Sequence, residues 1–209
     1  MFACCVPDVP EPAVVEIQAK PVLMEKASQS HIEDNASHGI FTVKVPAKRH
    51  STLGLEVETG KLGPIVMEVT KGAVDDFNQL NPLRTIQPHD LILQIGEAKG
   101  TEAILARLAA PLQDGKFTLH RPRRMQIKLD KKVNETLGVK MTLKSQIAGA
   151  VITAVESTGL VAKWNAQHPS DAVSVSDRLL AVNGVTDLKE TLAEELKKET
   201  DLELTLLKY

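Results

Sequence analysis

The 209-residue sequence has little cysteine, no excess of basic residues and no long apolar run. Its two cysteines, Cys4 and Cys5, are adjacent near the start of the sequence, which excludes a disulfide framework or a cysteine-ligated metal cluster in the body of the chain. The 25 Lys and Arg against 27 Asp and Glu give a net charge of -2, so nucleic acid is disfavoured as a partner. No run of about eighteen apolar residues occurs, so we expect no membrane span, and no signal-peptide pattern is visible.

Sequence signatures of enzymes are missing as well. The histidines are scattered without a paired metal-ligand spacing, and the sequence has no phosphate loop, dinucleotide fingerprint or Gly-x-Ser-x-Gly motif. We therefore expect a protein that is not an enzyme and binds neither cofactor nor metal. Asp90 and Asp177 recur at equivalent places, and we expect each to cap a turn before a strand.

What the sequence does contain is an ordinary globular composition and an internal repeat. Hydrophobic residues make up 43% and charged residues 25%, which is typical of soluble folded chains. Residues 1–40 differ from the rest, because prolines interrupt them and acidic residues outnumber basic ones. We interpret this segment as an acidic N-terminal tail.

The repeat divides the remainder into two halves. Phe41–Val45 and Thr52-Leu53-Gly54-Leu55 recur as Met125–Leu129 and Thr136-Leu137-Gly138-Val139, at an offset of 84 residues. Later positions match at an offset of 87 residues: Gly72, Asn78, Pro82 and Asp90 correspond to Gly159, Asn165, Pro169 and Asp177. A small domain copied once explains this pattern, and we expect the first copy at 41–122 and the second at 123–209.

Each copy has the same expected order of elements. Three apolar or alternating strands come first, followed by a short helix at 73–80 or 160–167 that ends before a proline. In the first of these helices, Val74, Phe77 and Leu80 form an apolar stripe. A fourth strand, a second helix at 101–109 or 188–198 and a final strand complete each copy.

This order, with an apolar-Gly-apolar turn before the second strand, resembles the PDZ domain. The second copy matches best, since Ser176-Asp-Arg-Leu-Leu-Ala-Val-Asn-Gly184 is similar to the family's Gly-Asp-Arg-Ile-Leu-x-Val-Asn-Gly stretch. The first copy keeps Thr52-Leu53-Gly54-Leu55 but lacks the Arg and the Asn-Gly turn. The resemblance implies an α+β fold: two tandem PDZ-like domains, each a small, partly open antiparallel barrel or sandwich with two helices.

The resemblance also implies that each copy binds the extended or C-terminal peptide of a partner by strand addition. The turns would offer backbone N–H groups to a terminal carboxylate, helped by Lys48 or Lys132, and the second strand and second helix would form the groove. The remaining groove residues of the first copy are Leu53, Gly54, Leu55, Val57, Thr101, Ile104, Leu105 and Leu108. Those of the second are Leu137, Gly138, Val139, Met141, Lys189, Leu192, Ala193 and Leu196.

Thr101 and Lys189 occupy the place where the family often has a specificity-determining His. We expect Lys189 to favour an acidic ligand residue and Thr101 a smaller polar or apolar one. The alternative for the Leu-Gly turns is a purely structural bend between two strands. For Lys48 and Lys132 the alternative is a solvated surface lysine.

Two functions follow as hypotheses. The leading one is a non-catalytic adaptor or scaffold that binds peptides of partner proteins. The alternative is a constitutive structural or peripheral subunit of a larger complex, in a membrane or organelle, with degenerate grooves. We expect an intracellular protein, in the cytoplasm or on the surface of a membrane complex. Cys4 and Cys5 are either unmodified thiols or sites of lipidation that would give peripheral membrane association.

Overall fold

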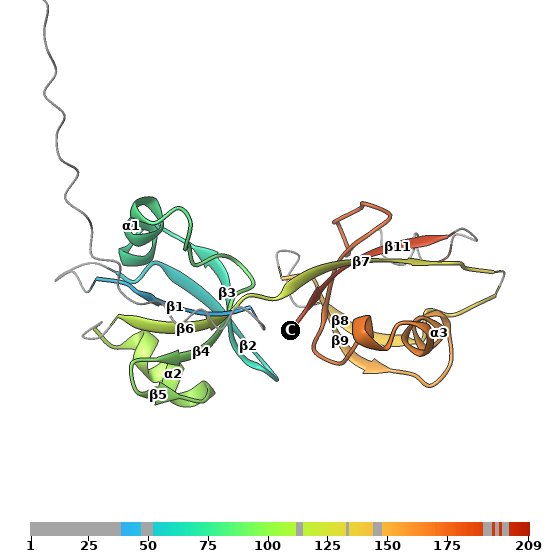
Figure 1. Ribbon diagram of the computed structural model, residues 1–209, viewed down its shortest axis with the longest axis horizontal. Helices are drawn as coiled ribbons and strands as arrows, with labels where there is room; N and C mark the ends of the chain where they lie inside the picture. The colour runs from blue at the N-terminus through green and yellow to red at the C-terminus, as the bar shows by residue number, and fades with distance from the viewer. Residues whose placement is uncertain are drawn as a thin grey trace, which may run out of the picture. The chain divides into compact units, whose positions relative to one another are not determined.

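Two antiparallel sheets, one from each copy, organise the chain. The computed structural model describes residues 39–46, 52–111, 115–132, 134–143, 148–189, 194, 197 and 201–209 (Figure 1), and these belong to one compact unit. The first sheet has six strands between Ile40 and His120, and the second has five between Arg123 and Lys208. None of the helices that the structure describes is long and apolar enough to cross a membrane.

The first copy has the expected element order with one addition. Its sheet has the strand order β1-β6-β4-β3-β2, and β5 pairs with β4. The strands are β1 (Ile40–Lys44), β2 (Leu55–Gly60), β3 (Gly63–Val69), β4 (Leu91–Ile95), β5 (Ala98–Lys99) and β6 (Lys116–His120). The helices are α1 (Ala73–Leu80) and α2 (Thr101–Ala109), with the predicted bounds. In Figure 1 strands β1, β6 and β4 lie between these two helices.

The second copy repeats this arrangement, with strand order β7-β11-β10-β9-β8. Its elements are β7 (Arg123–Leu129), β8 (Val139–Leu143), β9 (Ala150–Val155), α3 (Leu160–Gln167), η1 (Pro169–Asp171), β10 (Arg178–Val182) and β11 (Leu202–Lys208). Helix α3 has the predicted bounds. Most of the helix expected at 188–198 lies outside the described residues, although Glu194 and Lys197 are helical.

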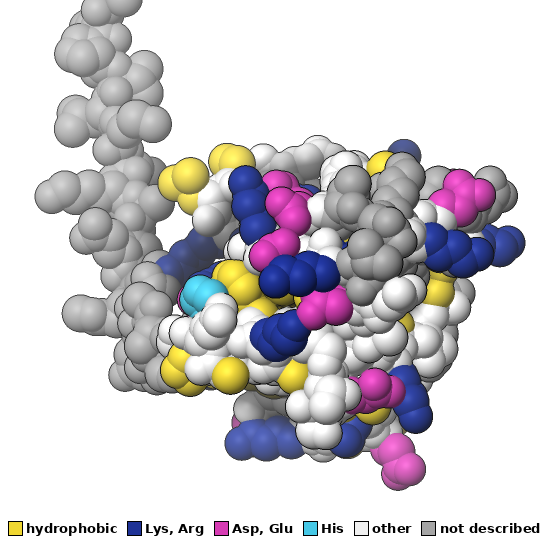
Figure 2. Space-filling view, turned by 90° about the vertical axis from the view of Figure 1, so that its right-hand side faces the viewer, with side chains coloured by type: hydrophobic (Ala, Val, Ile, Leu, Met, Phe, Trp, Pro, Cys, Tyr) yellow, Lys and Arg dark blue, Asp and Glu magenta, His cyan; other side chains and the backbone are white. Residues whose placement is uncertain are grey.

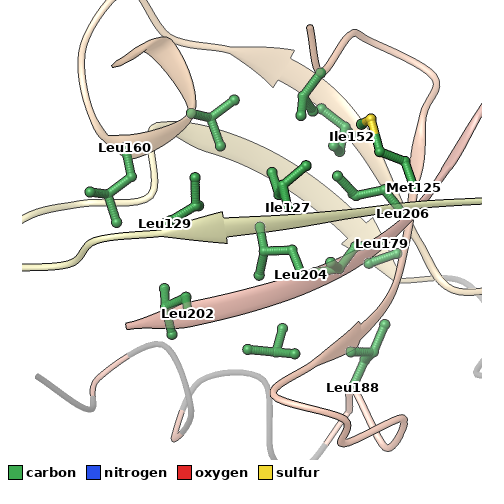
Figure 3. Packing of buried hydrophobic residues seen from close by; sticks show 14 residues of the cluster. Met125, Ile127, Leu129, Ile152, Leu160, Leu179, Leu188, Leu202, Leu204 and Leu206 are labelled. Atoms are coloured by element: carbon green, nitrogen blue, oxygen red, sulfur yellow. The ribbon is translucent and has the colours of Figure 1, made fainter. Parts of the chain in front are cut away.

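Each copy builds its own apolar core, as alternation along the strands requires. In the second copy Met125, Ile127 and Leu129 of β7 are buried against Leu202, Leu204 and Leu206 of the neighbouring β11. Figure 3 shows Ile127, Leu204 and Leu179 converging on this core. The first copy buries the corresponding positions Val43 and Val45 with Val74, Phe77 and Ile104. The duplicated strand pattern therefore gives two cores, and the predicted tandem PDZ-like fold is confirmed.

One apolar residue of the predicted helical stripe does not join the core. Leu80 is 78% exposed, because it is the last residue of α1 and the chain turns away at Asn81. Leu83, in the following loop, is 98% exposed. Leu80 therefore shares the helical spacing of Val74 and Phe77 but not their burial.

The loop after the first helix is held by an asparagine in both copies. The Asn78 side chain donates to the Ile86 carbonyl and accepts from the Ile86 N–H, both at 2.8 Å. Asn165 forms the same pair of bonds with Val173, at 2.8 and 2.7 Å. One amide side chain thus ties two positions eight residues apart to each other, and it satisfies both backbone groups of the second position.

We expect Asn165→Ala to lower the free energy of unfolding of the second copy by about 1–3 kcal/mol, because two part-buried hydrogen bonds are lost. Trp164 is the single tryptophan of the sequence, so its fluorescence during denaturant unfolding reports on this copy. Gln167→Ala, an exposed change on the same helix, is the control and should leave stability nearly unchanged. Equal stability of the two variants would contradict the role of Asn165.

Candidate functional site

Both sheets end in the strand that follows the Leu-Gly turn. In the first sheet β2 pairs with β3 alone, and in the second β8 pairs with β9 alone, among the strands that the structure describes. Each therefore presents one edge with unpaired backbone groups. An extended peptide of another molecule pairs with edges of this kind.

The turn that begins each edge strand is fixed against the first helix. The Thr52 and Leu53 carbonyls accept from the Ala73 and Val74 N–H groups at the start of α1, at 2.9 and 3.0 Å. In the second copy Thr136 and Leu137 accept from Leu160 and Val161, both at 3.0 Å. These bonds supply partners for helical N–H groups that have none inside the helix.

This attachment requires two glycines to pass one another closely. A Cβ on Gly54, whose φ is +73°, would lie 2.4 Å from the Thr70 carbonyl oxygen. A Cβ on Gly72 would lie 2.7 Å from the Gly54 nitrogen. Gly138 and Gly159 repeat this approach, and a Cβ on Gly138 would lie 2.2 Å from the Thr158 oxygen. The glycines are thus needed for the turn itself, whatever it binds.

The direction of the backbone groups along β2 follows from one bond at its start. The Gly54 carbonyl accepts from Thr70 N–H on the β3 side, at 3.0 Å. In an antiparallel ladder alternate residues bond to the same neighbour, so Leu55 and Val57 direct their N–H and C=O groups to the open edge. In the second copy the Glu156 N–H donates to the Gly138 carbonyl at 2.8 Å. The backbone groups of Val139 and Met141 on β8 are therefore directed to the open edge as well.

The expected groove residues of the first copy are placed around this edge. Leu53, Leu55, Val57 and Leu108 are half-buried and pack against the first core, and Leu105 is half-buried on α2. Thr101 is the first residue of α2, and its Oγ1 is 4.0 Å from where a Cβ on Gly63 would lie. Thr101 therefore lies near the hairpin end of β2 and β3. Lys48 lies outside the described residues.

In the second copy the structure describes the strand side of the expected groove. Leu137, Val139 and Met141 are half-buried and pack against the second core, and Gly138 is buried. Lys189 is exposed, and its backbone N–H donates to Asp187 at 3.3 Å. The expected positions Leu192, Ala193 and Leu196 lie outside the described residues, as do Cys4 and Cys5.

Lys132 lines a hollow of about 300 Å³ on the α3 side of the second copy, together with Lys128, Lys163 and Trp164. Acidic residues line the same hollow: Glu135 forms an ion pair with Lys163 and accepts from the Lys132 N–H at 3.0 Å. Hydrogen bonding to Lys163 lowers the pKa of the Glu135 carboxyl. Figure 2 likewise shows basic and acidic side chains side by side on one face of the molecule. The carboxylate-binding role of Lys132 stays a prediction.

The repeated aspartates precede β4 and β10. Asp90 is fully buried and accepts from Gln87 N–H at 2.8 Å, and Asp177 accepts from Ser174 N–H at 2.8 Å. Arg121 also donates to both Asp90 oxygens, at 2.9 and 2.8 Å. These bonds are those of turn-capping residues. Within the described ranges, no three or more His, Cys, Asp or Glu side chains are grouped to hold a metal.

Side chains of the two copies also meet one another. Arg178 is 1% exposed, and its guanidinium donates to the Ala148 carbonyl at 3.0 Å and to Glu58 of β2 at 3.5 Å. The Tyr209 hydroxyl donates to the His89 carbonyl at 3.0 Å, and burial raises the pKa of Tyr209 to about 12. These contacts could not be predicted from the sequence, because the family-like stretch around Arg178 indicates only a strand.

The comparisons with known proteins come from solved structures. No family model and no curated protein matches the chain. "Structure of INAD PDZ45 in complex with NG2 peptide" is 16% identical, with a TM-score of 0.37, and covers 81% of this chain and 88% of that one. "Complex structure of INAD PDZ45 and NORPA CC-PBM" is 14% identical, with a TM-score of 0.35, and covers 81% and 90%. Such likeness concerns fold alone.

The duplicated element order, the Leu-Gly turn and the open second strand are those of the PDZ fold. The chain consists of two PDZ-like folds in tandem. Its edges, its Leu-Gly turns and the half-buried apolar residues on the strand side are arranged alike in both copies, which makes each copy a candidate protein-interaction module.

We expect Gly138→Ala to destabilise the second copy by about 2 kcal/mol or more, since a Cβ at positive φ would overlap the Thr158 carbonyl. Trp164 fluorescence during unfolding measures the loss. Gly184 also has positive φ but has nothing within 4 Å of its would-be Cβ, so Gly184→Ala is a control for φ strain alone. Equal effects of the two changes would contradict the close approach as the cause.

Tyr209 is the single tyrosine of the sequence, so its ionisation can be followed by phenolate absorbance. We expect a midpoint near pH 12 in the folded chain, and a midpoint near the ordinary value of 10.0 in denaturant. Because the folded-state pKa is raised, the stability that the neutral phenol contributes is present below pH 10 and is lost as the pH rises toward 12. Circular dichroism shows whether the chain is still folded during the titration. An ionisation midpoint near pH 10 in the folded chain would contradict the burial of Tyr209.

Proposed function

We propose that the protein is a non-catalytic adaptor in which each copy holds an extended segment of a partner protein as an added strand on β2 or β8. One observation carries this proposal: each sheet ends in a strand with an open edge that starts at a rigidly held Leu-Gly turn. An added strand would bond to the outward groups of Leu55 and Val57, or of Val139 and Met141.

The geometry of the Leu-Gly turn favours a ligand peptide whose C-terminus lies at the turn. The positive φ of Gly54 and Gly138 turns successive N–H groups toward one side, and such a concave arrangement binds anions. A terminal carboxylate is the anion that an added strand would bring to this position. Half-buried apolar side chains beside the edge, Leu55 and Val57 or Val139 and Met141, would contact the apolar last residue of the ligand.

The tandem arrangement supports an adaptor role. Arg121 and Pro122 alone separate β6 from β7, so the two edges belong to closely linked copies. A partner with two suitable segments, or two partners brought together, would gain from a high effective concentration at the second edge.

We expect the full chain to enrich peptides from a library with randomised C-terminal residues, and Val57→Pro and Met141→Pro to abolish this binding at the first and second edge. Proline removes an N–H that points to the open edge, and edge strands tolerate proline at such positions. Binding constants of the enriched peptides, measured by fluorescence polarisation, test the expectation.

Val57→Ala and Met141→Ala are the matched controls. They shorten the same side chains but keep the N–H, so affinity should fall less than with proline. Unfolding curves of all four variants check that the fold survives. If no peptide is enriched, or if enriched peptides bind the proline variants as well as the unchanged chain, strand addition at these edges is wrong.

A second candidate function is constitutive docking of the chain as a structural subunit of a larger complex. The exposed apolar side chains Leu80 and Leu83 favour it, because they lie on or beside the loop that Asn78 holds in place and are not among the expected groove residues. Partners captured from cell extracts can be compared among variants. If Leu80→Ser and Leu83→Ser lose partners that Val57→Pro and Met141→Pro retain, the structural subunit is favoured over the adaptor.

A further inference from the structure

The two open edges carry opposite charge at equivalent positions. On β2, Glu56 and Glu58 alternate with the core-facing Leu55 and Val57. On β8, the matching positions are Lys140 and Thr142. Glu56 and Lys140 are both exposed. They correspond at the repeat offset of 84 residues, so the difference is one of charge at a matched place.

The neighbouring strand strengthens the contrast. Glu56 pairs with Glu68 of β3, which puts two exposed carboxylates side by side on the outer face of the first sheet. Lys140 pairs with Ala154 of β9, so its ammonium group has no charged cross-strand neighbour there. Directly opposed like charges destabilise a sheet, and a cation placed beside Glu56 would relieve this repulsion.

Strand addition would place a ligand side chain at that point. The Glu56 backbone groups face β3, so the ligand residue opposite Glu56 belongs to a non-hydrogen-bonded pair, in which side chains approach most closely. If the last ligand side chain lies on the core face beside Leu55, the penultimate one lies on the outer face, next to Glu56 or Lys140.

We propose that the two copies select ligands of opposite charge: the first prefers Lys or Arg at the penultimate position, and the second prefers Asp or Glu. The proposal rests on the strand addition proposed above. Glu56 with Glu68, and Lys140, are the specificity-determining residues, and the binding surface is the outer face of each edge.

Other charges on these faces do not reverse the contrast. Glu58 is on the same face of β2 as Glu56 and is directed to Arg178, which is almost completely buried. Thr142, at the matching place on β8, is neutral. Glu56, Glu68 and Lys140 form no ion pair within the part of the chain that the structure describes.

The test uses three peptides that differ at the penultimate residue, which is Lys, Gln or Glu, in the best sequence enriched for each copy. Each edge is measured in the full chain, with the other edge blocked by Met141→Pro or Val57→Pro. We expect the first copy to bind the Lys peptide about two- to tenfold more tightly than the Glu peptide, and the second copy to show the reverse.

Charge reversal on the protein should exchange these preferences. Glu56→Lys should make the first copy prefer the Glu peptide, and Lys140→Glu should make the second prefer the Lys peptide. Glu97→Lys and Lys99→Glu change net charge equally in the β4–β5 hairpin and should leave the order of the peptides unchanged. At about 1 M salt the preference should shrink, while binding by backbone and apolar contacts persists.

The possible failures are distinguishable. Peptides that bind each edge and are lost with the proline variants, but show equal affinity for Lys and Glu, would overturn charge selection and leave strand addition standing. A preference unaffected by Glu56→Lys or Lys140→Glu would overturn the assignment to these residues. Absence of binding by any peptide would overturn both proposals.

Discussion

The close approach of two glycines in each copy is the constraint on which the edge depends. Gly54 against Gly72, and Gly138 against Gly159, let the chain before the second strand lie on the start of the first helix. Carbonyl groups of the turn then accept from the helical N–H groups, so helix and strand fix one another. Because the turn is held from behind, the strand that leaves it has a fixed direction, and no other strand that the structure describes pairs with its outer edge.

Much of this could be predicted from the sequence because the signals are local. The bounds of α1, α2 and α3 follow from the glycine before each helix and from the proline two residues after its end. Alternation along β1 and β7 identified the buried face of each. The repeat gave more, since it assigned the first copy to the same fold although its stretch around Asp90 lacks the family pattern.

The remaining features depend on partners distant in sequence. Asn78 and Asn165 were visible as repeated residues, but their bonds to Ile86 and Val173 require a loop closure that no periodicity shows. Arg178 looked like an ordinary strand residue, but it is buried and its guanidinium contacts Glu58, 120 positions away. Pairing of Glu56 with Glu68 likewise follows from sheet register, which the sequence did not provide.

Strands β3 and β9 each carry a bulge next to the exposed charge of the edge strand. The register shifts between Glu56 and Val57 in the first sheet and between Lys140 and Met141 in the second. The extra residue is Met67 on β3 and Thr153 on β9, so the edge strands themselves stay regular. A bulge increases the local twist of the pair that contains it. Twisted, charged edges pair poorly with a second flat sheet, so the bulges and charges protect the chain against edge-to-edge aggregation.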